Sequence, residues 1–171
     1  MTRYDAAIEV RMARIDAFWE NGRYEEGYEI LESILFDEPG HGKAHSYIGW
    51  YAYARMQDYE LAKRHYELAL KFNPAFAGTY INFTTVLIGL GNYVEAIKMA
   101  RRGMNVGGSS KAQLLSEIGR AYEYLNLLPL ARGAYKEAYL VAETDEAMEA
   151  IKSAMVRVRK KRQLKSFGFT L

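Results

Sequence analysis

The sequence has 171 residues, of which 50% are hydrophobic and 26% are charged, proportions typical of an ordinary globular protein. The formal net charge of +2 is too small for the whole molecule to be drawn to nucleic acid or to an anionic membrane. The absence of cysteine excludes disulfides, cysteine-ligated zinc and thiol chemistry. Near Met1 no stretch is apolar enough to predict a secretory leader or a membrane span, so we expect a cytoplasmic protein.

Three short segments of similar sequence each separate two helical stretches. They are Gly-Arg-Tyr-Glu-Glu-Gly at 22–27, Asp-Tyr-Glu-Leu-Ala at 58–62 and Gly-Asn-Tyr-Val-Glu-Ala at 91–96. Only three prolines occur and strand-like alternation is lacking, so these segments predict turns between helices. The surrounding units begin near Ile8, Gly42, Ala77 and Ala112, which gives steps of 34, 35 and 35 residues.

The unit that begins near Ala112 shows the repeat most fully, in Leu115, Ile118, Gly119 and Tyr122 of its first helix and Ala131, Tyr135 and Ala138 of its second. This pattern resembles the tetratricopeptide repeat, which has a W-x2-L-G-x2-Y, then A-x3-F, then P signature. The resemblance implies an all-α fold, a right-handed α-solenoid of four helix-turn-helix repeats plus a C-terminal capping helix. We expect a single domain over 1–171, with repeats at about 8–41, 42–76, 77–111 and 112–143, a capping helix at about 144–163 and a tail at 164–171.

A small residue is needed where the two helices of each repeat approach closely. In the second repeat we expect Gly49 to pack against Ala62, with Trp50 turned away from its own helix pair. In the first repeat Ile15 occupies the glycine site and Gly27 the alanine site. We expect the small Gly27 to compensate for the large Ile15, so that the pair keeps the same total volume. The two 35-residue steps each contain one extra residue, which we place at 55–57 and at 107–110.

The last repeat is bounded by helix-start signals. Ser110 with Gln113 predicts a capping box, and Thr144 precedes an acidic first turn. A long last helix should run from Thr144 to about Lys161. It should cover the open end of the fourth repeat with an apolar stripe at steps of three and four residues, made of Met148, Ile151, Met155 and Val158.

This last helix also carries the strongest charge feature. Residues 145–171 contain seven basic and three acidic side chains, a net charge of +4. Basic residues are favoured at helix C-termini, so the simplest interpretation is a solvated helix end. Such a local cluster is also a candidate contact patch for an acidic partner or, less favoured, for nucleic acid. The patch would comprise Arg157, Arg159, Lys160, Lys161, Arg162 and Lys165.

The sequence predicts no catalytic site, no cofactor and no metal centre. His41 and His45 are four residues apart, but Pro39 and Gly40 indicate a turn that leaves His41 outside the helix. No acidic or cysteine residue at suitable spacing completes a metal site. We expect His65 to be a solvated residue of a second helix. No glycine-rich phosphate-binding motif is present, and no acid, base and nucleophile converge, so we expect no enzyme.

In the tetratricopeptide-repeat proteins that this sequence resembles, the first helices line a concave surface that binds a peptide segment of a partner. Both tryptophans, Trp19 and Trp50, fall at the corresponding positions, where large aromatic side chains are common anchors. The alternative is that they only pack between adjacent first helices. The resemblance places the groove at Glu9, Met12, Asp16, Trp19, Lys43, Ser46, Trp50, Tyr53, Gly78, Ile81, Thr85, Ile88, Gln113, Ser116, Arg120 and Glu123.

One subclass of the family captures a C-terminal carboxylate with a clamp of lysine and asparagine side chains. Of the positions that form such a clamp, only Asn82 matches here. The resemblance therefore does not extend to a clamp for the tails of Hsp70 or Hsp90.

The resulting hypothesis is a non-catalytic adaptor or scaffold that binds a peptide segment of a partner protein in this groove. Two alternatives stay open. One is a structural subunit that self-associates, for example as a homodimer, through its ends or through residues 167–171. The other is a chaperone similar to the small tetratricopeptide-repeat chaperones of type III secretion systems.

Overall fold

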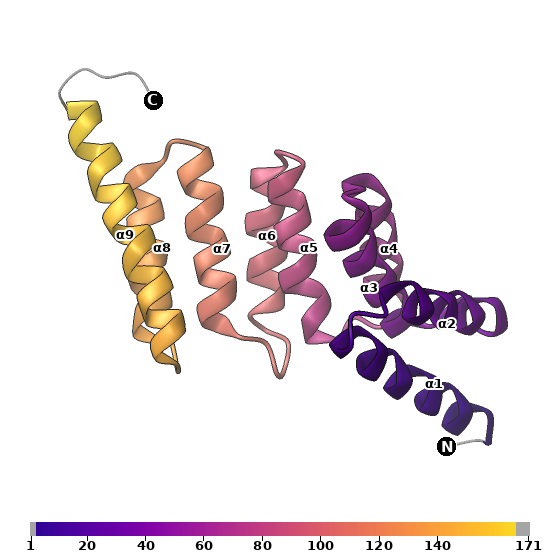
Figure 1. Ribbon diagram of the computed structural model, residues 1–171. Helices are drawn as coiled ribbons and strands as arrows, with labels where there is room; N and C mark the ends of the chain where they lie inside the picture. The colour runs from indigo at the N-terminus through magenta and orange to yellow at the C-terminus, as the bar shows by residue number, and fades with distance from the viewer. Residues whose placement is uncertain (1–2, 167–171) are drawn as a thin grey trace. The chain divides into compact units, whose positions relative to one another are not determined.

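The computed structural model describes the backbone of residues 3–166 and the side chains of residues 6–166. Over these residues the chain forms nine α-helices and one π-helical turn, without a strand, which confirms the all-α prediction. The elements in chain order are α1 (Arg3–Glu20), α2 (Tyr24–Asp37), α3 (Gly42–Tyr51), η1 (Ala52–Met56), α4 (Tyr59–Phe72), α5 (Ala77–Gly89), α6 (Tyr93–Gly103), α7 (Lys111–Tyr124), α8 (Leu128–Leu140) and α9 (Asp145–Ser166) (Figure 1).

The helices belong to two compact units, Met1–Thr79 and Tyr80–Leu171, which divide inside α5. In the first unit, α1 packs against α2 and α3 against α4. Its core is a continuous apolar cluster that joins the two pairs, made of Ile8, Met12, Ile15, Leu31, Ile34, Ala44 and Ile48.

In the second unit, α9 packs along α8 and also contacts α7. Its buried face consists of Ile151, Ala154 and Val158, and the predicted Met148 and Met155 pack beside them while partly buried. The stripe predicted for the last helix is therefore confirmed. The helix is longer than expected, because it continues to Ser166 where a tail was predicted from residue 164. Residues 167–171, the proposed self-association segment, lie outside the described residues.

Glycine marks the close approach of the two helices in two repeats. A side chain at Gly49 would lie 2.9 Å from the Tyr66 ring, and one at Gly119 would lie 2.8 Å from the Tyr135 ring. Gly49 thus faces the second helix of its own repeat, as predicted, but its nearest neighbour is Tyr66 and not Ala62. The large ring fills the space that the missing side chain leaves.

In the first repeat, the small residue of the second helix lies against a side chain that the sequence analysis did not pair with it. A side chain at Gly27 would overlap Trp19, with 2.2 Å to its Nε1 atom. Gly27 therefore makes room for Trp19. Ile15 is fully buried in the apolar cluster of the first unit.

The extra residue of the second repeat takes the form of a π-helical turn. Residues Ala52–Met56 widen the end of α3, and Gln57 closes the turn with a left-handed backbone, φ 56°. This is the position at which the repeat spacing placed the insertion, at residues 55–57. A single inserted residue is commonly absorbed as a π-bulge, because one wider turn preserves the faces of the helix on either side.

Helix starts in the second unit follow local sequence signals. Ser110 accepts a hydrogen bond from the backbone N–H of Gln113 at 3.3 Å, and Thr144 accepts one from that of Ala147 at 3.2 Å. Pro129 lies in the first turn of α8, where no donor is needed. Within residues 3–166, none of the helices combines the length and the apolar character that a membrane crossing requires.

Candidate functional site

The first unit presents a cluster of aromatic rings on its first helices α1 and α3 and at the start of α2. We call Trp19, Tyr24, Tyr47 and Trp50 the aromatic cluster. The Trp19 ring centroid lies 4.7 Å from that of Trp50 and 5.4 Å from that of Tyr47, and Tyr24 lies 6.2 Å from Trp50. Trp50 thus contacts the preceding repeat, through Trp19 of α1 and Tyr24 of α2. The sequence register that turned Trp50 away from its own helix pair is confirmed.

Trp19 is held in place by two features of its own repeat. Its ring lies over Gly27, and its Nε1 donates a hydrogen bond to the Tyr24 carbonyl oxygen at 3.3 Å. Trp19 is half-buried, as is Trp50. The packing alternative considered for the tryptophans is therefore met in part, since each residue packs against neighbouring rings and stays partly exposed.

Charged groups border the aromatic cluster. The Tyr47 hydroxyl donates a hydrogen bond to the exposed Asp16 carboxylate at 3.0 Å, and the Lys43 ammonium lies 5.6 Å from the centre of the Tyr47 ring. The Arg55 guanidinium, which belongs to the π-helical turn, lies 4.3 Å from the centre of the Tyr24 ring. Burial raises the pKa of Tyr47 and Asp16 raises it further, so this hydroxyl stays a donor at neutral pH.

A different arrangement occupies the second unit, around Glu123 of α7. Two bonds from Arg157 reach its carboxylate, from Nε and from Nη2, each at 2.9 Å. Lys161 Nζ lies 2.7 Å from Oε1, and the Tyr135 hydroxyl lies 3.3 Å from Oε2. Burial alone would raise the pKa of Glu123, but the bonds from Arg157 and Lys161 outweigh it and lower the pKa. The Glu123 carboxylate therefore joins the last helix to α7 and α8.

Of the remaining groove positions predicted in the second unit, Gln113 is exposed and the others, apart from the buried Ile88, are half-buried. Arg120 forms an ion pair with Glu117 one turn earlier on α7, and Thr85 donates to the carbonyl oxygen of Ile81 at 3.2 Å. Asn82 is also half-buried. Burial raises the pKa of Glu117, and the charge of Arg120 offsets part of that effect.

Four predicted groove residues turn out to be buried, which corrects their expected role. Met12 is 1% exposed, Ser46 2%, Ile88 6% and Glu123 8%. Met12 belongs to the apolar cluster, and the Ser46 hydroxyl accepts a hydrogen bond from Thr79 at 2.9 Å. These side chains support the fold, because a partner on the surface would find almost nothing of them to contact.

The predicted basic patch is divided by the structure. Arg157 and Lys161 point to Glu123, whereas Arg159, Lys160 and Arg162 are exposed without an ion pair among the described residues, and so is Lys165. Sequence spacing could have suggested the pairing only if the contact between α7 and α9 had been known. Glu123 lies 34 positions before Arg157, one repeat away.

The histidines form an unexpected pair. His41 caps α3 by accepting the N–H of Ala44 at 3.1 Å, so it precedes the helix as predicted. His65 is half-buried against His45, with 3.1 Å between their Nδ1 atoms, and is not the solvated residue that we expected. His45 Nε2 lies 3.0 Å from the Pro39 carbonyl oxygen and must donate to it. Consequently His45 Nδ1 is the acceptor and His65 Nδ1 the donor when both rings are neutral.

Burial explains the titration of this pair. It lowers the pKa of His65 to about 4, with further contributions from the nearby charges of His45 and Arg64. It also lowers the pKa of His45, although the hydrogen bond to Pro39 opposes the change. Among the described residues no group of three or more histidine, aspartate or glutamate side chains is arranged to hold a metal ion.

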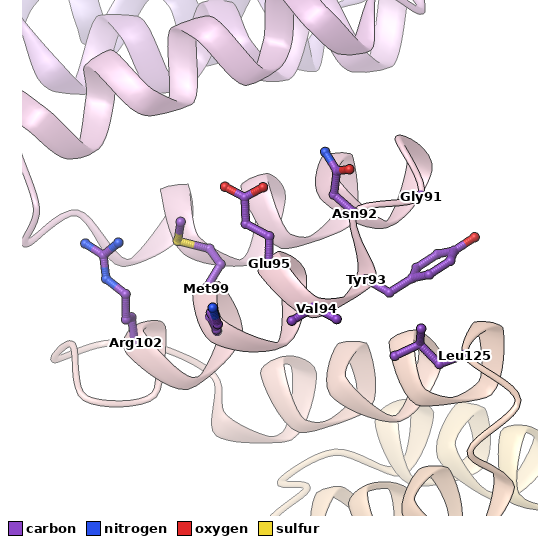
Figure 2. Close-up of a pocket in the computed structure, with 9 residues that line it drawn as sticks. Gly91, Asn92, Tyr93, Val94, Glu95, Met99, Arg102 and Leu125 are labelled. Atoms are coloured by element: carbon purple, nitrogen blue, oxygen red, sulfur yellow. The ribbon is translucent and has the colours of Figure 1, made fainter.

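An open cavity of about 700 Å³ lies along α6, a helix that the sequence did not suggest as a site. In Figure 2, Glu95, Met99 and Arg102 point to the same side of α6, and Leu125 approaches from the turn after α7. The spacing of four and three residues aligns these three side chains on one helix face. They offer a carboxylate, a guanidinium and an apolar surface, and Tyr93 and Lys98 also line the cavity.

The helical arrangement is similar to that of several solved structures. MamA AMB-1 is 24% identical, with a TM-score of 0.65 over 77% of this chain and 76% of that one. Pseudomonas aeruginosa PilF is 15% identical, with a TM-score of 0.80 over 93% of this chain and 70% of that one. The Arabidopsis OM64 TPR domain is 21% identical, with a TM-score of 0.62 over 71% and 96%. No protein-family model and no curated protein matches the sequence.

The fold is the tetratricopeptide-repeat fold. The paired helices and the recurring glycine and tyrosine positions that carried the resemblance in the sequence are therefore features of that fold. Within this fold, Trp19, Tyr47 and Trp50 of the aromatic cluster lie on the first helices of the first two repeats, and Tyr24 begins the second helix of the first repeat.

Proposed function

We propose that this tetratricopeptide-repeat chain is a non-catalytic scaffold that binds a peptide segment of a partner protein on its first-helix faces. The observation that carries the proposal is the aromatic cluster, in which Trp19 and Trp50 contact each other and each residue stays partly exposed. Rigid aromatic rings bury a large area with few rotatable bonds, so they are frequent anchors at binding surfaces.

The chemistry around the cluster suggests the character of the partner. Asp16 lies on one side of the rings and Lys43 on another, within 5.6 Å of the Tyr47 ring. A segment that is apolar at its centre and charged at its flanks would complement this surface, as a helix or as an extended peptide. Tyr53 completes the proposed contacts of the first unit, and Ile81, Asn82, Thr85 and Arg120 are those of the second.

The test begins with a partner captured by the tagged chain from its source cell and identified. Replacing Trp50 by alanine should weaken binding of that partner by about 2 kcal/mol or more, measured by calorimetry. The matched control is Phe36→Ala, which removes an aromatic ring that is 88% exposed on α2 and should leave affinity unchanged. Circular dichroism would check that each variant stays folded.

A second substitution distinguishes residues that act on the rate of association from residues that act on affinity. Lys43→Gln should change the association rate and the salt dependence more than the affinity, because charges at the edge of an interface act mainly on encounter. The proposal fails if the Trp50→Ala variant binds the partner as well as the parent does while a chain without the basic residues from Arg157 to Lys165 does not. The last helix would then be the functional surface.

A further inference from the structure

A second cavity, of about 360 Å³, lies in the second unit where α9 packs beside α7. Its lining consists of Arg120, Glu123 and Tyr124 from α7 with Arg157 and Lys161 from α9. The last helix is therefore more than a cover for apolar surface, because it contributes two cationic side chains to a hollow on the molecule.

These cations have donor capacity beyond what the protein itself uses. The bonds of Arg157 come from Nε and Nη2, and its Nη1 has no partner among the described residues. Lys161 donates to Glu123 and has two further N–H groups. The Arg120 Nε is buried and lacks a hydrogen-bond partner among residues 6–166. Buried donors of this kind normally find an acceptor.

One wall of the cavity is aromatic. Tyr124 is 61% exposed, and its ring stacks on that of Tyr93 with 5.2 Å between centroids and 5° between planes. Because this stacking fixes the orientation of the ring, Tyr124 offers a rigid apolar platform beside the cations.

The electrostatic balance of the cavity favours an anion. Three cationic side chains line it, against the carboxylate of Glu123 in the lining and that of Glu117, which pairs with Arg120. The surrounding field has the same sign, because residues 150–166 include seven basic and no acidic side chains. An approaching carboxylate would meet an attractive potential and find oriented donors within the cavity.

The geometry points to this cavity as a docking site for an acidic peptide segment of a partner protein. A glutamate or aspartate side chain of the segment lies among Arg120, Arg157 and Lys161, and an adjacent apolar residue packs on Tyr124. Glu123 acts as the internal carboxylate that holds the cations in position for the incoming one. This inference rests on the proposed peptide-scaffold function and gives the chemistry of the segment that the second unit binds.

Two neighbouring lysines allow the cavity to be distinguished from the general charge of α9. Lys161 lines the cavity, whereas Lys160 is exposed and does not. Lys161→Gln and Lys160→Gln change the net charge equally. Lys161→Gln also leaves both Arg157 bonds to Glu123 in place, at 2.9 Å each, so the helix attachment is retained. Thermal unfolding followed by circular dichroism would confirm that both variants fold.

The probe is a short fluorescein-labelled peptide of alternating glutamate and leucine, read by fluorescence anisotropy with the full chain at physiological salt. A peptide with glutamine in place of glutamate is its uncharged counterpart. We expect the acidic peptide to bind at least about tenfold more tightly than the glutamine peptide. Lys161→Gln should weaken it about fivefold or more, whereas Lys160→Gln should change it less than about twofold, because only direct charge pairs act strongly on affinity.

Three results would overturn the inference. The acidic and glutamine peptides could bind equally, or both lysine variants could weaken binding by the same factor, which indicates a diffuse field. Duplex DNA or vesicles with anionic lipid could bind more tightly than the peptide and with equal dependence on Lys160, which would assign α9 to another class of partner. The Trp50→Ala measurement is independent of these outcomes. A partner that depends on Trp50 but not on Lys161 would reject this cavity and keep the proposed function.

Discussion

The repeats at 42–76 and 112–143 share one packing device but differ in the polar groups around it. In both, a glycine of the first helix faces a tyrosine ring of the second, Gly49 with Tyr66 and Gly119 with Tyr135. The tyrosine follows its glycine after one more residue in the earlier repeat, which is the residue that the π-helical turn absorbs. The insertion therefore left the crossing of the two helices intact.

The two repeats differ in the polar side chains that connect their helices. The earlier repeat has His45 and His65 in contact across its helices, where the later repeat has Leu115 and Ala134 at the corresponding sequence positions. The later repeat instead connects Tyr135 to Glu123. The His45–His65 contact lies inside a helix pair and depends on neutral rings. The Glu123 carboxylate, by contrast, is charged and joins its repeat to α9, the next helix. We expect the two repeats to respond differently to pH and to loss of charge.

The largest effect should come from Glu123→Gln, which breaks the polar connection of the later repeat. Glu123 is 8% exposed, and its loss leaves Arg157 and Lys161 without their anion. We expect the free energy of unfolding to fall by about 2–3 kcal/mol, below the value for a fully buried pair because both cations reach solvent.

The measurement is chemical denaturation followed by circular dichroism, with Glu149→Gln as the matched control. Glu149 pairs with Lys152 at 3.3 Å on the exposed side of α9, and its replacement should cause no measurable change. If the two variants were equally stable, Glu123 could not be what attaches α9 to its neighbours.

A smaller effect tests whether the two glycine sites are equivalent. Gly49→Ala and Gly119→Ala should each lower the free energy of unfolding by about 1–2 kcal/mol, because the new methyl group meets a buried tyrosine ring. Gly133→Ala is the control. Its position in α8 has nothing within 4 Å, so alanine should stabilise the helix by up to about 1 kcal/mol. A neutral effect at both facing glycines would show that the rings move aside freely.

The smallest effect is a pH dependence specific to the earlier repeat. The pKa of His65 is about 4 in the folded protein, below the value of about 6.5 expected for an unfolded chain. Between these values the unfolded state binds more protons, so the free energy of unfolding decreases as the pH falls from 6.5 toward 4. We expect a loss of about 1 kcal/mol between pH 7 and pH 5, allowing for partial exposure of the ring.

The double variant His45→Leu with His65→Ala copies the later repeat and should remove most of this dependence in denaturation curves recorded at both pH values. His41→Asn is the control, since asparagine can still cap α3 and the His45–His65 pair stays intact. If the free energy of unfolding of the parent did not change between pH 7 and pH 5, protonation of the His45–His65 pair would not destabilise the folded protein.

Sequence reasoning reached the fold because its signals are local and repeated. Spacing located the helix pairs, the residue absorbed by η1 and the apolar stripe of α9. It went wrong where a residue's neighbour depends on the third dimension. Gly27 makes room for Trp19, half-buried His65 contacts His45, and Glu123 lies under the cations of α9.

The sequence by itself determined the all-α repeat fold and the face on which Trp50 lies, because helix periodicity and a recurring glycine need only nearby residues to be recognised. Only the tertiary structure decided which charged and aromatic side chains meet. Ion pairs such as Glu123 with Arg157 join residues one repeat apart, and long side chains can reach several partners at that separation. Packing selects one of them, since the buried carboxylate must find donors while exposed lysines need none.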